Sequence, residues 1–181
     1  MDWAPQRIET TRLLLVRPTA ADAEAIFSRY ASDPDVTHYL SWPRHLTVAD
    51  TATFLAFSES EWNRWPAGPY LIRSRTDRTL LGGTGLSFET PWRAMTGYVV
   101  AKDSWGRGYA TEALEAMVAL ARRLRVMRLY ALCHPAHAAS QRVLEKCGFV
   151  KEATLHRHSV FPNLDRDMPA DTDCYAVILG D

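Results

Sequence analysis

The chain has 181 residues, of which 47% are hydrophobic and 23% are charged, a balance typical of globular proteins and unlike that of disordered or fibrous ones. This length suits one domain covering residues 1–181. Lysine plus arginine equals aspartate plus glutamate at 21 each, so no net field would recruit nucleic acid or an anionic membrane. We therefore expect a small or locally charged partner.

Membrane and disulfide signals are both weak. The longest apolar runs fall far short of the ~18 residues of a spanning helix, and the N-terminus has no signal-peptide core. Cys133, Cys147 and Cys174 are odd in number, lack a C-x-x-C spacing and fall inside apolar patterns. We expect buried, reduced thiols in a cytoplasmic protein, with no metal site.

The N-terminal half is expected to contain strands and two capped helices. Thr19 and Thr47 each precede a helical stripe and have an aspartate three residues later, which resembles a capping box. Asp33-Pro34 ends the first helix. Glycines within residues 82–85 indicate close backbone approach in a strand, because no Gly-Lys-Ser/Thr follows them. The expected elements are a strand at 13–16, a helix at 20–31, a helix beginning after Thr47, and strands at 70–73 and 80–88.

The C-terminal half is expected to contain the central strand and the helices beside it. A helix-sized connection separates two apolar strands, which implies that they are parallel neighbours. Gly148 is expected to cap the last helix. The expected elements are a strand at 95–101, a helix at 109–125, a strand at 126–134, a helix at 137–147, and an antiparallel pair at 149–158 and 173–179 around a polar loop at 162–171. Together the two halves predict one mixed α/β layer domain.

Residues 96–114 are the stretch around which the chain is organised. They begin as an apolar run with β-branched residues, turn through Gly106 and Gly108, and continue with apolar positions at helical spacing. The glycines permit backbone conformations closed to other residues. The unsatisfied amides of the first helical turn and the helix dipole then form a site for an anion such as phosphate. The alternative is a tight strand-to-helix turn that binds no ligand.

Two blocks resemble the GNAT N-acetyltransferases, in the branch that includes the ribosomal-protein N-terminal acetyltransferases. The first is Gly97-Tyr98 followed by Trp105-Gly106-Arg107-Gly108-Tyr109-Ala110-Thr111-Glu112-Ala113, which resembles the acyl-CoA pyrophosphate loop. The second runs from His134 to Phe149 and is similar to a block that in this branch usually reads asparagine, two residues, serine, a helix and then Gly-Phe. The resemblance covers nearly the whole chain, most strongly residues 97–149.

The resemblance implies a GNAT-like mixed sheet whose central parallel strands splay apart to receive acetyl-CoA. One N–H group among Val99, Val100 and Ala101 would stabilise the oxyanion, and Thr111 could add a hydroxyl to the phosphate grip. Arg107 either adds charge near a phosphate or is a solvated cation. The residues expected to bind the cofactor are Val99, Val100, Ala101, Gly106, Arg107, Gly108, Tyr109, Ala110, Thr111, His137 and Ser140.

The expected catalytic residues are Ser140, Glu89 and His137. Ser140 matches the serine of the branch, whose hydroxyl would donate to the departing thiolate; a small residue on a buried helix face has the same pattern. His137 replaces the asparagine of the branch and either contacts the pantetheine arm or transfers a proton. Met95 stands where the branch often has a glutamate base, so other candidates are needed. These are Glu89 first, then His134, His38 and His158.

The expected function is transfer of an acetyl group from acetyl-CoA to a primary amine, either a protein N-terminus or a small molecule. Direct transfer is expected, because no cysteine lies in an electropositive motif that would favour an acyl-enzyme. The alternative is an acyl-CoA-binding sensor that has lost catalysis, for which Met95 and His137 are the evidence. A nucleic-acid-binding domain is disfavoured by the zero net charge. The oligomeric state stays open, with a homodimer among the alternatives.

Overall fold

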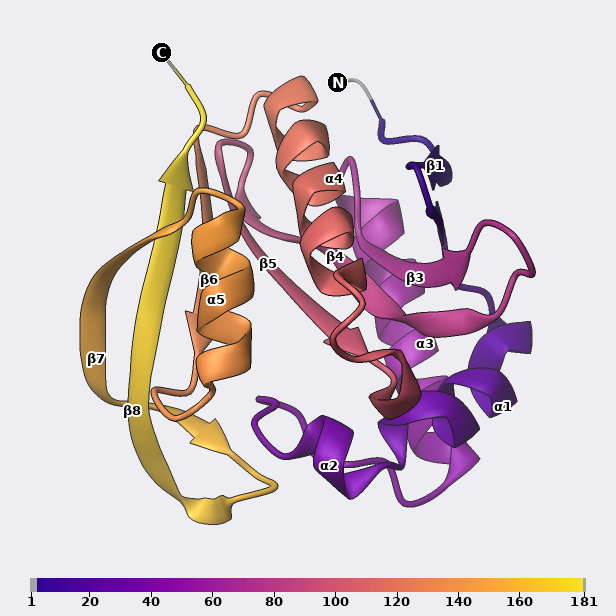
Figure 1. Cartoon of the computed structure of the whole chain (residues 1–181), viewed down its shortest axis with the longest axis horizontal. Coiled ribbons are helices and arrows are strands. Elements are labelled where there is room, and N and C mark those ends of the chain that lie inside the picture. Colours follow the sequence, from indigo (N-terminus) through magenta and orange to yellow (C-terminus); the bar gives the residue numbers. More distant parts are fainter. Residues whose placement is uncertain (1–2, 181) are drawn as a thin grey trace.

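Eight strands form one sheet in the computed structural model, which describes residues 3–180 (Figure 1). Their order is β1-β2-β3-β4-β5-β6-β8-β7, and the neighbours are antiparallel except for the parallel pair β5 and β6. The strands are β1 (Arg7–Glu9), β2 (Leu13–Val16), β3 (Pro69–Ser74), β4 (Leu80–Thr90), β5 (Arg93–Val100), β6 (Arg128–Cys133), β7 (Val150–Phe161) and β8 (Asp165–Ile178). The predicted mixed sheet with a central parallel pair is confirmed.

Helices flank this sheet, with α4 and α5 in front of it and α3 behind it in Figure 1. The helices are α1 (Ala23–Ile26), α2 (Pro34–Thr37), α3 (Val48–Arg64), α4 (Tyr109–Arg123) and α5 (Ala138–Lys146). A 3-10 turn at Ala20–Asp22 precedes α1, a π turn at Phe27–Ala31 follows it, and a 3-10 turn at Lys102–Ser104 follows β5. Among residues 3–180, no helix combines the length and apolar character needed to cross a bilayer.

The main core lies between α4 and the sheet. Ala113, Leu114, Met117 and Ala121 recur at helical spacing and are fully buried, so the helix presents one apolar face to the strands. The residues of β6 alternate between the core and the other face of the sheet, with Leu129, Ala131 and Cys133 buried. Complete burial of one such leucine stabilises the fold by about 1.5–3 kcal/mol. This packing fixes α4 against β5 and thereby holds the turn between them.

The helix starts follow the predicted caps. At both Thr19 and Thr47, the aspartate three residues later accepts a hydrogen bond from the cap's backbone amide. The predicted helix at 20–31 is helical throughout, but it passes from 3-10 to α to π geometry. Asp33 ends that segment and also caps α2, accepting from the amides of Asp35 and Val36, an element that the sequence analysis missed.

The closing hairpin corrects one prediction. The polar loop expected at 162–171 is wrong, because β7 runs to Phe161 and β8 begins at Asp165. The charged residues of this stretch were interpreted as a loop, whereas they belong to exposed strand positions that need no apolar alternation. The short strand β1 was also missed. The result is a long hairpin whose tip reaches toward the α2 region (Figure 1).

The strand glycines act as predicted. A Cβ on Gly82 would lie 1.9 Å from the carbonyl oxygen of Val99, and one on Gly85 would lie 2.7 Å from the Cα of Pro69. Neighbouring strands therefore approach more closely here than a side chain would permit. This close approach positions β4 against β5, the strand that carries the candidate site.

Candidate active site

The parallel strands β5 and β6 separate partway along their length. They are paired only at Arg93–Met95 on β5 and Arg128–Tyr130 on β6. β5 then continues to Val100 against β4, and β6 continues to Cys133 against β8. The expected splay is therefore present, and it opens a gap that begins beyond Met95. The gap-side amides of β5 beyond the paired stretch are free for a ligand, whereas the carbonyl of Val100 accepts the indole N–H of Trp105 at 2.7 Å.

A cavity of about 810 Å³ lies at this gap. Its walls come from the end of β5, the glycine turn and first turn of α4, one face of α5, and the segment that follows α2. It thus occupies the region between α2, α4 and α5 in Figure 1. The expected site residues that line it are Val99, Val100, Gly106, Gly108, Tyr109, Ala110, Thr111, His137 and Ser140.

The glycine turn has the geometry of an anion site. Gly106 and Gly108 have φ angles of 73° and 78°, in the left-handed region that favours glycine. The amides of residues 109–111 have no acceptor within the described part of the chain, and they point along the α4 axis as an N-terminal turn does. Lys102, Arg142 and Lys146 also line the cavity, whose one lining carboxylate, Asp35, is paired with Lys102. A polyphosphate such as that of coenzyme A fits this donor set.

A salt bridge that the sequence analysis missed holds the turn. Glu112, in the first turn of α4, accepts hydrogen bonds from the Thr10 hydroxyl (2.6 Å), the Arg12 amide (2.7 Å) and the Arg12 side chain (2.7 Å). Arg12 also donates to the carbonyl of Arg107 at 2.8 Å. Burial alone would raise the pKa of Glu112, but these hydrogen bonds outweigh it and lower the pKa. The β1–β2 turn thereby braces the glycine turn from outside the cavity.

Two expected cofactor contacts are not supported by the geometry. Arg107 does not line the cavity. Ala101 is buried and its amide donates to Leu81 at 2.8 Å, so it cannot stabilise an oxyanion. Because backbone groups alternate in direction along a strand, the Val99 amide also faces β4, whereas the amides of Tyr98 and Val100 face the gap. Of the three expected donors only Val100 remains, and Tyr98 joins it.

Ser140 lies within hydrogen-bonding distance of a tyrosine that the sequence analysis passed over. The Tyr98 hydroxyl is 2.9 Å from both the side-chain oxygen and the carbonyl oxygen of Ser140. Burial raises the pKa of Tyr98, so the phenol keeps its proton. Tyr98 is the tyrosine of the Gly-Tyr pair, and its strand position beside the glycine turn was the signal available in the sequence. The pair brings two hydroxyls to one wall of the cavity.

Three aromatic rings stack where β6 leads into α5. Tyr39 lies between His134 and His137, with ring centroids 5.0 Å and 4.8 Å apart. Burial, with a smaller contribution from the neighbouring imidazoles, lowers the pKa of His137. Burial also lowers the pKa of His134, whose Nδ1 accepts the Ala136 amide at 3.1 Å. Both imidazoles are therefore neutral near pH 7.

The structure places Glu89 away from the cavity. Its carboxylate pairs with Arg93 and accepts the Tyr130 hydroxyl at the first residues of β5. The six residue steps from Arg93 to Val99 span about 20 Å, which excludes direct proton transfer between Glu89 and a group near Val99. His158 is exposed on β7 and also lies outside the cavity, whereas His38 lines it. The sequence could not reveal that Glu89 lies far from the cavity, because strand length alone does not say which end of a strand faces the ligand.

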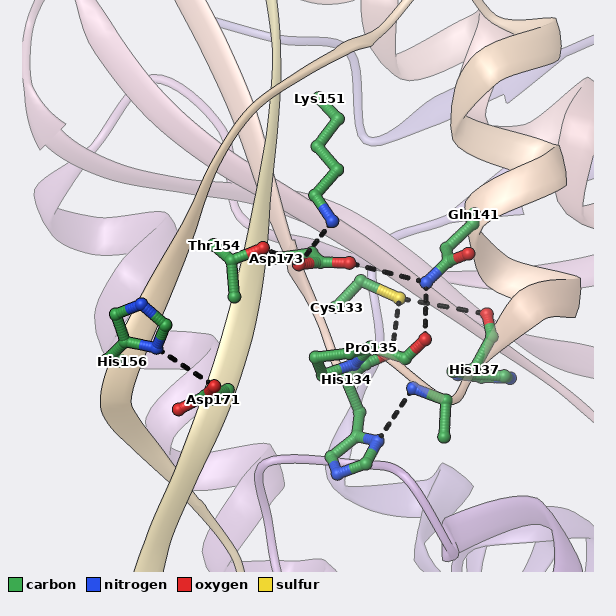
Figure 2. Close-up of polar contacts among 11 residues, drawn as sticks. Cys133, His134, Pro135, His137, Gln141, Lys151, Thr154, His156, Asp171 and Asp173 are labelled. Atoms are coloured by element: carbon green, nitrogen blue, oxygen red, sulfur yellow. Dashed lines mark hydrogen bonds and ion pairs between the residues drawn. The ribbon is translucent and has the colours of Figure 1, made fainter.

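A buried carboxylate braces the turn that leads into α5 (Figure 2). The Asp173 side chain is 2% exposed and pairs with Lys151 at 2.8 Å. It also accepts from the Thr154 hydroxyl at 2.7 Å and from the Gln141 amide group at 3.4 Å. Gln141 in turn donates to the Pro135 carbonyl at 2.8 Å. Strands β7 and β8 thus hold the start of α5, next to Ser140.

Cysteine and metal chemistry have little support at this site. Burial raises the pKa of Cys133, so its thiol stays protonated near the gap. The three cysteines are free, with Cys133 buried and Cys147 and Cys174 only partly buried, a correction to the expectation that all three are buried. Within residues 3–180, no group of three or more histidine, cysteine or acidic side chains is placed to hold a metal ion.

Several solved structures share this fold. An acetyltransferase (GNAT family) from Bacillus anthracis superposes with a TM-score of 0.82 at 24% identity, covering 96% of this chain and 98% of that one. RimL, a ribosomal L7/L12 alpha-N-protein acetyltransferase in complex with coenzyme A, superposes with a TM-score of 0.84 at 23% identity, covering 97% and 99%. At these identities the likeness establishes the fold.

Sequence comparison establishes the family. The uncharacterized N-acetyltransferase YoaA of Bacillus subtilis (strain 168) is 30% identical over 179 residues, covering 94% of this chain and 96% of that protein. The family model of the acetyltransferase (GNAT) domain matches residues 12–150. That range contains β5, the splayed gap, the glycine turn and α5. The chain belongs to the GNAT acetyltransferase family, whose members use acetyl-CoA.

Proposed function

We propose that this acetyltransferase moves the acetyl group to a primary amine by direct attack in a ternary complex. The observation that carries the proposal is the splayed gap, which places free strand amides beside a glycine turn with the geometry of a phosphate site. The amides of residues 106 and 108–111, with Arg142 and Lys146, hold the phosphates of acetyl-CoA. When bound, acetyl-CoA supplies an activated thioester carbonyl.

One of the two gap-facing amides, that of Tyr98 or that of Val100, stabilises negative charge on the carbonyl oxygen, because amides two residues apart on a strand lie about 6.6 Å from each other and cannot both reach it. Both face the gap, and neither has a strand partner on that side. Preorganised donors of this kind act strongly because they need no reorientation as charge develops. The acyl group therefore lies along β5, between the glycine turn and the start of the splay.

The Ser140 hydroxyl provides a proton to the departing sulfur. Tyr98 can donate its single hydroxyl proton to the Ser140 carbonyl, which leaves the serine O–H free to rotate toward the cavity. The proton that the attacking amine loses as the amide forms restores the serine hydroxyl, while the Tyr98 phenol, kept protonated by burial, stays hydrogen-bonded to Ser140. This partly buried hydroxyl pair suits the role better than Cys133, because both hydroxyl residues line the cavity and Cys133 does not.

The amine enters unprotonated. An α-amino group has a pKa near 8, so about a tenth is already neutral at pH 7 and no carboxylate base is required. His137 contacts the pantetheine arm in the place of the family asparagine, and its ring completes the wall with Tyr39. An α-amino acceptor, either a protein N-terminus or a small molecule, fits the absence of a base at Met95. RimL, named as acting on ribosomal protein L7/L12, supports the first class.

Incubation with acetyl-CoA and a panel of amines, followed by detection of free thiol, tests the proposal. Amine-dependent thiol release above the uncatalysed rate is expected, with an acetylated product of the added mass. Tight acetyl-CoA binding without release would instead favour the alternative function, an acyl-CoA sensor. Met95 and His137 are the observations that favour this alternative, because both replace residues that the family uses.

A further inference from the structure

The tip of the β7–β8 hairpin is joined to the segment after α2 by one side chain, Asn163. Its amide nitrogen donates to the carbonyls of Thr37 (2.7 Å) and Trp42 (2.9 Å). Its amide oxygen accepts the backbone N–H of Arg44 at 2.8 Å. Both amide protons are used, and the two carbonyl partners fix the orientation of the amide. The partners are 119 to 126 residues away in the sequence.

These hydrogen bonds bracket the residues that form a wall of the cavity. His38, Tyr39 and Leu40 line the cavity and lie between the two carbonyls that Asn163 binds. The Tyr39 ring continues the wall by stacking on two imidazoles. Phe161 begins the same hairpin turn and meets one of these imidazoles, that of His134, edge-on at 4.8 Å. The hairpin turn thus contacts this wall in two ways: Asn163 hydrogen-bonds to the backbone on either side of residues 38–40, and Phe161 packs against His134, on which Tyr39 stacks.

We infer that Asn163 is a positioning residue for the amine acceptor. It lies outside the cavity and acts by holding the segment 38–40, which we name the acceptor wall, in the position where Tyr39 stacks. The inference rests on the proposed function: with the phosphates at the glycine turn and the acyl group along β5, we take the remaining space of the cavity beside this wall as the amine site. The glycine turn is held separately, by Arg12 and Glu112. Loosening the wall therefore leaves the phosphate grip of the glycine turn intact.

Replacement of Asn163 tests whether amine binding can be weakened without weakening acetyl-CoA binding. Asn163→Ala removes all three hydrogen bonds, whereas Asn163→Asp keeps the acceptor for Arg44 but faces an oxygen toward two carbonyls. Asn63→Asp, an exposed position on α3, is the matched control for the charge change. In both Asn163 variants we expect the backbone amides of residues 38–42 and 44 to exchange hydrogen about tenfold faster. The KM for the amine rises about tenfold with a smaller change in kcat, and the Kd for acetyl-CoA stays within about twofold.

Each other outcome overturns the inference. Unchanged exchange in both variants would show that the wall is held without Asn163. Faster hydrogen exchange of the wall amides with an unchanged KM for the amine would mean that Asn163 has only a structural role. Weaker acetyl-CoA binding together with a lower Tm would indicate general destabilisation. If the wild-type protein acetylates no amine, the proposed function fails; the exchange measurement, repeated with acetyl-CoA bound, still decides whether Asn163 holds the wall.

Discussion

The glycine-turn end of the cavity is contiguous in sequence, whereas the opposite end is assembled from three distant segments. Residues 98–111 supply the strand end and most of the phosphate donors, all of them backbone groups set by local conformation. The acceptor wall comes from residues 38–40, stacks on the start of α5 and is held by the β7–β8 hairpin. A change in one backbone angle is therefore enough to disrupt the glycine turn. Loss of a long-range contact instead makes the acceptor wall more mobile.

The largest expected effect is on acetyl-CoA affinity, when the conformation of the glycine turn is disrupted. Gly108→Val places a β-branched residue at φ 78°, which it adopts only with strain, and so distorts the amides at the start of α4. We expect acetyl-CoA affinity to fall at least about 100-fold, since each lost charge-assisted hydrogen bond contributes about 1.5–3 kcal/mol. Isothermal titration calorimetry measures this directly.

Gly148→Val is the matched control for that variant. Gly148 has a similar φ of 82° but ends α5 outside the cavity. The same strain should lower its Tm while leaving the acetyl-CoA Kd within about threefold of wild type. Equal loss of affinity in both variants would mean that strain, and not the amide donors of the glycine turn, explains the result.

A second prediction concerns Ser140, which lies on α5 between the glycine-turn end and the acceptor-wall end of the cavity. Ser140→Ala removes the proposed proton donor to sulfur and should reduce kcat by about 10²–10⁴-fold, with the acetyl-CoA Kd unchanged. Ser60→Ala, on the exposed face of α3, serves as the control. Steady-state kinetics with a saturating amine provide the measurement. Turnover within threefold of wild type would remove Ser140 from the mechanism.

A third prediction tests the brace of the glycine turn through pH. The lowered pKa of Glu112 means that its carboxylate stabilises the fold fully above the unfolded-state value of about 4.3 and loses this effect as pH falls through the folded-state value. Glu112→Gln should therefore lower Tm by about 3–6 °C at pH 7, and the difference from wild type should shrink toward pH 3.

Glu115→Gln, at an exposed position on the same helix, controls for the loss of one charge. Thermal unfolding followed by circular dichroism across the pH range supplies both curves. A Glu112→Gln difference that stays constant with pH would show that the loss comes from altered shape and not from the ionised carboxylate.

The smallest expected effect is at His137. His137→Asn restores the residue common in the branch that the sequence resembles, so kcat/KM should stay within about threefold if this side chain only contacts the pantetheine arm. The measurement is the pH dependence of kcat/KM for both proteins. A loss of 100-fold or more, with the acidic limb of the profile removed, would instead identify His137 as a proton acceptor.

The sequence predicted elements whose signals are local. The capping boxes at Thr19 and Thr47 and the cap at Gly148 depend on residues within one turn of each other, and all are observed. The closing antiparallel pair was predicted correctly, but its strands were predicted too short at the hairpin end, because the exposed residues there are charged and carry no alternation. Glu89 was chosen as base by its strand position, which does not specify how far it lies from a ligand.

By itself, the amino-acid sequence determined the secondary structure around the glycine turn and the type of ligand that such a turn binds, because φ angles and helix-end amides are set by neighbouring residues. Tertiary structure alone decided which amides face the gap, which hydroxyl meets Ser140 and what holds the acceptor wall. Those features depend on contacts such as Tyr98 with Ser140 and Asn163 with Thr37, which join residues 42 and 126 positions apart. Only the packed sheet brings such pairs together.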